Sequence, residues 1–144
     1  MNSKLVLRIA VVSEWALFAS VLVASSLLAN ALPVELTSYL DAEASSGLSS
    51  TEGAIAVVML VLLPVYVAAA IGLFLLKNWA RWTYVFCLLL LYPLTAFLGP
   101  VVEHGVVSVL DELVVLCQGL IVGIAFFSNA IDDRVSPPQS EVEI

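Results

Sequence analysis

A glutamate lies inside the first long apolar segment of the chain, where a carboxylate has little access to water. Glu14 comes six residues after Arg8, the last cation of the amino-terminal head, so a helix places it about 9 Å deeper in a membrane. A carboxylate there costs about 2.5–3.5 kcal/mol on insertion scales, so it must be protonated, paired or hydrated. Glu14 is therefore a candidate proton- or cation-binding residue. The alternative is a structural ion pair with Arg81 or Lys77, whose long side chains reach along the interface.

A second polar group lies in the last apolar segment. Asp111 and Gln118 are seven residues apart and share one face of a helix, while Glu112 lies on another. We expect Asp111 and Gln118 to line a polar path, and Asp111, Glu112 and Gln118 are further candidates for proton or cation binding. In the alternative interpretation the helix begins near Ser108, and both acids lie in its hydrated first turn, where the helix dipole favours negative charge.

The sequence contains no pattern of residues that indicates an enzyme. His104 is the single histidine and follows Glu103, but a metal centre needs three or four ligands in a fixed geometry. No nucleophile–base pair, glycine-rich phosphate loop or cysteine cluster is present, and Cys87 and Cys117 both lie in apolar segments. We therefore expect no catalytic residue, no metal and no cofactor.

The composition indicates a membrane protein. Of the 144 residues, 62% are hydrophobic and 12% are charged, and the mean hydropathy is +1.09. Soluble domains contain about 25% charged residues, so too few polar side chains remain here to cover a soluble core. The net charge of −7 also disfavours nucleic-acid binding, which needs clustered lysine and arginine. The lipid bilayer is the expected environment.

We predict an all-α integral membrane protein built as a bundle of four transmembrane helices. A crossing needs about 20 apolar residues, and residues 1–131 form one transmembrane domain on this basis. Its helices are expected at about 6–32, 53–76, 79–98 and 106–129. The acidic tail, residues 132–144, is expected to be disordered and cytoplasmic.

The first outer loop shows two further signals. Pro33 followed by Leu36, Tyr39 and Leu40 predicts a short amphipathic helix. Ser49 and Glu52 match a capping box that opens the second crossing.

The amino-terminal segment has a rival interpretation as a secretory signal peptide. Lys4 and Arg8 resemble its basic region, and Ala29-Asn30-Ala31 resembles its cleavage site. The apolar core of a signal peptide usually has about 7–15 residues. The apolar run here is longer and contains Glu14, so we favour a retained helix.

The cations predict the orientation. Lys77, Trp79, Arg81 and Trp82 form a polar break between the second and third crossings, with the composition of an interface anchor. With four crossings, all the cations fall on one side of the membrane. The positive-inside rule then places both termini and the middle turn in the cytoplasm. We expect the membrane to be the inner (plasma) membrane of a bacterium.

Small residues four positions apart predict the faces through which the helices pack. Close approach of backbones, rather than hydrophobic burial, drives helix association in lipid. We expect these faces to contact helices of this chain, of a second copy in a homo-oligomer, or of another membrane protein. The predicted packing residues are Ala16, Ser20, Ala24, Ala68, Gly72, Gly119 and Gly123.

The chain is similar to the small multidrug-resistance transporters in two respects, its predicted number of helices and Glu14 in the first helix. Members of that family have about four short helices and a glutamate in the first. This resemblance implies a glutamate that binds protons and cationic drugs competitively within a dimer. The long acidic first loop and the internal Pro64 and Pro93 depart from that pattern.

Two functions follow from these observations. The first is a small non-enzymatic membrane protein that acts as an accessory, regulatory or assembly subunit through helix–helix contacts. The alternative is a proton-coupled small transporter, or an oligomeric ion channel, that uses Glu14.

Overall fold

The structure is a computed structural model that describes residues 3–28, 33, 35–38, 42, 47, 49–98 and 103–128. These residues form four long helices and no strand, which confirms the all-helical class. The helices are α1 (Ser3–Leu28), α3 (Ser50–Phe74), α4 (Asn78–Thr95) and α5 (Gly105–Phe127). Residues 35–38 also have helical backbone, whereas Tyr39, Leu40 and the predicted tail lie outside the described residues.

Three of the helices, α1, α3 and α5, are long and apolar enough to cross a membrane. The shorter α4 has 18 residues and begins with the polar Asn78 and Arg81, which lower its mean hydropathy. Large apolar side chains remain exposed on the helix surfaces, including Leu60 at 70% and Leu116 at 69%. Such a surface is suited to lipid rather than to water.

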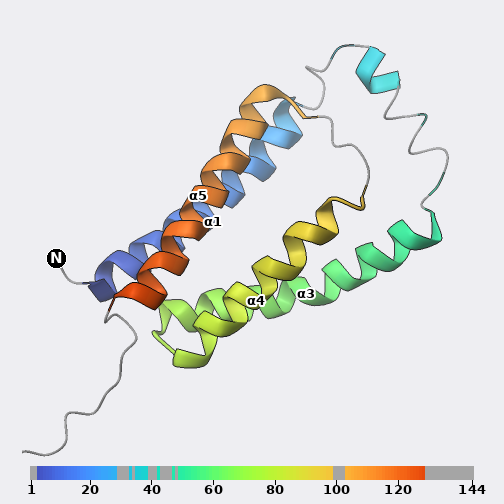
Figure 1. Ribbon diagram of the computed structural model, residues 1–144. Helices are drawn as coiled ribbons and strands as arrows, with labels where there is room; N and C mark the ends of the chain where they lie inside the picture. Colours follow the sequence, from blue (N-terminus) through green and yellow to red (C-terminus); the bar gives the residue numbers. More distant parts are fainter. Residues whose placement is uncertain are drawn as a thin grey trace, which may run out of the picture.

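The helices form two antiparallel pairs that meet at one end (Figure 1). Helix α1 packs along α5, and α3 packs along α4. The pairs touch near the α3–α4 turn and diverge toward their other ends, like the arms of a V. Burial follows the same pattern, because the buried residues of α1 lie in its first half and those of α3 in its last turns. The joined end therefore holds the core.

The turn between α3 and α4 has the hydrogen bonds of a Schellman motif. The amide of Lys77 donates to the carbonyl of Gly72 at 2.8 Å, and the amide of Leu76 donates to that of Leu73 at 2.9 Å. Leu76 has a φ of 60°, the left-handed conformation that this motif requires. Because the motif closes the helix within three residues, α4 already begins at Asn78, and Trp79, Arg81 and Trp82 lie in its first turns.

Side-chain caps fix where α3 and α5 begin. The Ser49 side chain accepts from the Glu52 amide and the Glu52 carboxylate accepts from the Ser49 amide, which confirms the predicted capping box. His104 caps α5 by accepting from the amide of Val106 at 3.3 Å. The late start near Ser108 is therefore wrong, because this cap starts α5 at Gly105 and leaves Asp111 and Glu112 beyond its first turn.

The small residues differ in what they contact. Gly72 is buried, and a Cβ added to it would lie 2.6 Å from the Cβ of Ala80 and 3.1 Å from the ring of Trp79. Added Cβ atoms at Gly119 and Gly123 would meet nothing within 4 Å. Ala16, Ser20 and Ala68 are exposed and Ala24 is half-buried. Of the predicted packing glycines, Gly72 is thus the one at a tight contact among the described residues.

Gly72→Ala and Gly119→Ala make the same chemical change at sites with opposite surroundings. We expect Gly72→Ala to destabilise the protein by about 1–3 kcal/mol, the usual cost of overpacking. Gly119→Ala should be neutral or slightly stabilising, because alanine is the better helix former. Thermal unfolding in detergent, followed by circular dichroism, compares them. Equal stability of the two variants would contradict the close approach at Gly72.

Candidate functional site

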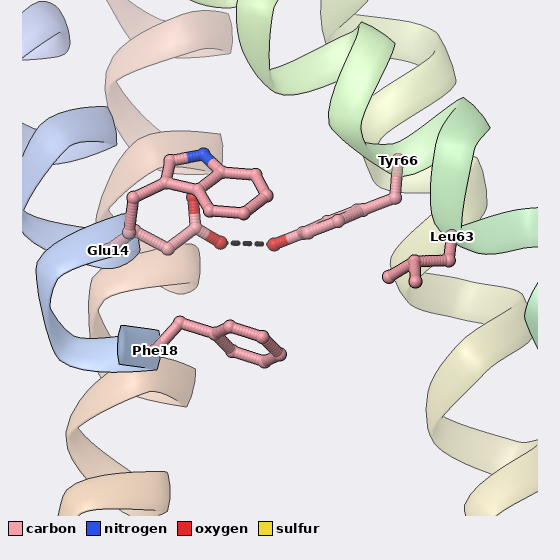
Figure 2. A pocket seen from close by; sticks show the side chains of 5 residues that line it. Glu14, Phe18, Leu63 and Tyr66 are labelled. Atoms are coloured by element: carbon pink, nitrogen blue, oxygen red, sulfur yellow. Dashed lines mark hydrogen bonds between the residues drawn. The ribbon is translucent and has the colours of Figure 1, made fainter. Parts of the chain in front are cut away.

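The candidate site is centred on Glu14, whose side chain is 2% exposed at the joined end of the helix pairs. Two phenols from the opposite pair donate to its Oε1 atom: Tyr66 of α3 and Tyr84 of α4, at 2.6 Å. Figure 2 shows Glu14 and Phe18 on α1 facing Tyr66 and Leu63 on α3 across the gap between the pairs. Hydrogen bonds to a carboxylate are stronger than those between neutral groups. Glu14 therefore ties one helix pair to the other.

A chain of hydrogen bonds continues from Glu14 into α5 and back to α4. The amide nitrogen of Gln118 donates to the Tyr66 hydroxyl at 2.9 Å. The Tyr92 hydroxyl in turn donates to the amide oxygen of Gln118 at 2.5 Å. The Tyr66 oxygen thus accepts from Gln118 while its hydrogen is donated to Glu14. Gln118 thus orients Tyr66 toward the carboxylate.

The second carboxylate oxygen of Glu14, Oε2, differs from the first. Oε2 is buried and has no hydrogen-bond partner among the described residues. A carboxylate oxygen in this position can bind a proton or a small cation, and either would neutralise a buried negative charge.

The ion pair between Glu14 and Arg81 is not formed within the described part of the chain. The Arg81 guanidinium lies 5.5 Å from the centre of the Phe126 ring, and its buried Nε has no hydrogen-bond partner there. Trp82 packs edge-on against the same ring. The Arg81 guanidinium thus lies against Phe126 of α5 instead of pairing with Glu14. Lys77, the other predicted partner, is exposed in the turn.

Two cavities meet at Tyr66. The smaller has a volume of about 20 Å³ and is lined by Glu14, Trp15, Phe18, Leu63 and Tyr66. It has room for about one water molecule. The larger, about 420 Å³, shares Phe18, Leu63 and Tyr66 with the smaller one. It occupies the gap between the arms of the V and falls in the usual range for small-molecule pockets.

Two of the three remaining predicted candidates lie apart from this network. Asp111 and Glu112 are exposed on α5 and take no part in its hydrogen bonds. Gln118 is joined to Glu14 through Tyr66, although the two are 104 residues apart in the sequence. The described residues contain no group of three histidine, cysteine or acidic side chains that could hold a metal.

The sequence analysis missed the tyrosines that hold Glu14. Tyr66 is the clearest case, since it lies well inside α3, far from the interfacial position that tyrosine favours. A phenol at that depth needs a hydrogen-bond partner. This signal pointed to a buried acceptor, but the sequence could not say on which helix the acceptor lay.

Comparison with known proteins adds no relative. No family model matches the chain, and no curated protein or solved structure matches it.

Removing the Tyr84 hydroxyl tests its bond to Glu14. Tyr84 is 1% exposed, so Tyr84→Phe should lower the free energy of unfolding by about 1.5–3 kcal/mol, the contribution of a hydrogen bond to a charged group. A double-mutant cycle with Glu14→Leu isolates the pair. In the Glu14→Leu background, Tyr84→Phe should cost much less. An equal cost in both backgrounds would show that Tyr84 does not stabilise Glu14.

Proposed function

We propose that this protein is a small proton-coupled transporter in which Glu14 binds the proton. One observation carries the proposal: the Glu14 carboxylate is buried and accepts from Tyr66 and Tyr84, and its second oxygen has no partner among the residues that the structure describes. Ionisable residues inside a membrane are functional more often than structural. A carboxylate that links two helix pairs also supplies a physical means of coupling, because its protonation changes the bonds between them.

The proposed topology has four crossings. Helices α1, α3 and α5 supply three. The fourth is α4 extended by the apolar residues 96–98, which continue it as turns. With four crossings, the cations Lys4, Arg8, Lys77 and Arg81 share one side with both termini, and the positive-inside rule makes this side cytoplasmic. A bacterial inner membrane, with the short helix of the first loop outside, fits this arrangement.

The open side of the V supports access to the site. The larger cavity lies between the helix pairs and reaches Tyr66 and Gln118, which hydrogen-bond to each other and connect to Glu14. A solute in this cavity is thus separated from the proton site by one side chain. Opening or closing the V would expose that solute to one side of the membrane or the other, as alternating access requires.

A second candidate function is an accessory or assembly subunit. It is favoured by Gly119 and Gly123, which have open space beside them in the single chain and match the spacing of a helix-contact motif. Purification from native membranes in mild detergent tests it. A co-purifying membrane protein, lost on Gly119→Leu, would support the candidate, and a chain recovered without partners would contradict it.

Glu14→Gln tests the transporter directly. In proteoliposomes with an imposed pH gradient, we expect wild-type protein to conduct protons faster than protein-free liposomes. Glu14→Gln should return the rate to the protein-free level, because an amide does not exchange a proton at neutral pH. A trapped pH-sensitive dye provides the measurement.

Glu112→Gln is the matched control, since it makes the same change at an exposed carboxylate. It should conduct like the wild type. A Glu14→Gln rate equal to that of the wild type, or a wild-type rate equal to that of empty liposomes, would contradict the proposal.

A further inference from the structure

The larger cavity differs in chemistry from the smaller cavity beside Glu14. Its walls come from all four helices and are mainly aliphatic and aromatic. The polar side chains that line it are Tyr66, Tyr92, Thr95 and Gln118, and no charged side chain lines it among the described residues. Glu14 instead lines the smaller cavity, of about 20 Å³, which shares Tyr66 with the larger one.

The hydrogen-bonding capacity left in the cavity is specific. Gln118 uses one amide hydrogen on Tyr66 and has a second one free in the described contacts. Tyr92 uses its hydrogen on Gln118, which leaves its oxygen as an acceptor. Thr95 donates to the carbonyl of Tyr92 at 2.7 Å, so its oxygen also retains acceptor capacity. The cavity therefore offers one donor and neutral acceptors at adjacent positions.

We propose that the larger cavity binds a neutral, largely apolar molecule that carries one hydroxyl group. A hydroxyl can donate to the Tyr92 oxygen and accept from the Gln118 amide, while the apolar body lies against residues such as Met59, Leu63 and Leu88. A volume of about 420 Å³ accommodates a small bicyclic compound. This assignment rests on the proposed function, because it names the class of solute that the proton at Glu14 would drive.

Charge separates this class from the nearest competitor, a lipophilic cation. An ammonium group in the larger cavity would be surrounded by neutral side chains, and burying an unpaired charge is costly. The smaller cavity, which Glu14 lines, is too small for more than about one water-sized group. The smaller cavity is therefore assigned to the proton, and the larger cavity is assigned to the neutral solute.

Three probes of similar shape test the assignment. 2-Naphthol is neutral and carries a hydroxyl, 2-methylnaphthalene lacks the hydroxyl, and 2-naphthylmethylamine is a cation at neutral pH. Binding to wild-type protein in nanodiscs is measured by equilibrium dialysis, with protein-free nanodiscs subtracting the probe dissolved in lipid. We expect saturable one-to-one binding of 2-naphthol, with affinity about five- to tenfold above that of the other two, the effect of a hydrogen bond.

Two variants locate the binding. Gln118→Leu should reduce 2-naphthol affinity to that of 2-methylnaphthalene, and Tyr92→Phe, at a half-exposed residue, provides a milder change if Gln118→Leu unfolds. Ala56→Phe introduces a ring at the cavity wall without touching the hydrogen-bond chain, and should abolish saturable binding of every probe. Glu112→Gln should leave all affinities unchanged.

Each contrary result has a definite meaning. Equal affinity for 2-naphthol and 2-methylnaphthalene would show that the cavity takes any apolar group, such as a lipid chain, and would overturn the assignment. Tighter binding of the amine, or binding that survives Ala56→Phe, would overturn it as well. Because no proton gradient is used, loss of the proton flux with 2-naphthol binding intact would contradict the transporter alone.

Discussion

The structure depends on how a single buried carboxylate is accommodated. Glu14 lies in an apolar helix that is long enough to cross a membrane, and a carboxylate in such a setting needs its hydrogen-bond partners within the protein. Tyr66 and Tyr84 supply two phenol donors from the other helix pair. The same end of the molecule holds the close contact of Gly72 with Ala80. That contact closes α3 on α4 within one pair, whereas the phenol hydrogen bonds and a buried apolar cluster that includes Leu7, Leu73 and Ile121 join the two pairs at this end.

The open arm of the V follows from this local joining. Contacts between the pairs are concentrated near the α3–α4 turn, and the pairs separate beyond it. The space between them becomes a cavity with Tyr66 in its wall and Gln118 and Tyr92 at its polar edge. Gln118 orients Tyr66, and Tyr66 meets Glu14. The same hydrogen-bond chain therefore contacts both the cavity lining and the end at which the helix pairs meet.

The sequence predicted the helices better than the partners of Glu14. Hydropathy located the apolar segments, and Ser49 with Glu52 identified the start of α3, because these signals are local. The choice of Arg81 as a partner rested on opposite charge, but Phe126 holds that guanidinium. Tyr66 and Tyr84 are 52 and 70 residues from Glu14, so only the packing of the helix pairs shows that they meet. Likewise, spacing alone does not distinguish the tightly packed Gly72 from the open Gly119.

The central claim is that Glu14 is the proton-binding group of this membrane site. Infrared difference spectroscopy of the protein in lipid, recorded across a pH titration, tests it most directly through the carbonyl band of a protonated carboxylic acid. We predict such a band for the wild type, lost in Glu14→Gln, shifted in Tyr84→Phe by the loss of a donor, and unchanged in Glu112→Gln. A carboxyl band that Glu14→Gln leaves intact at every pH would contradict the claim.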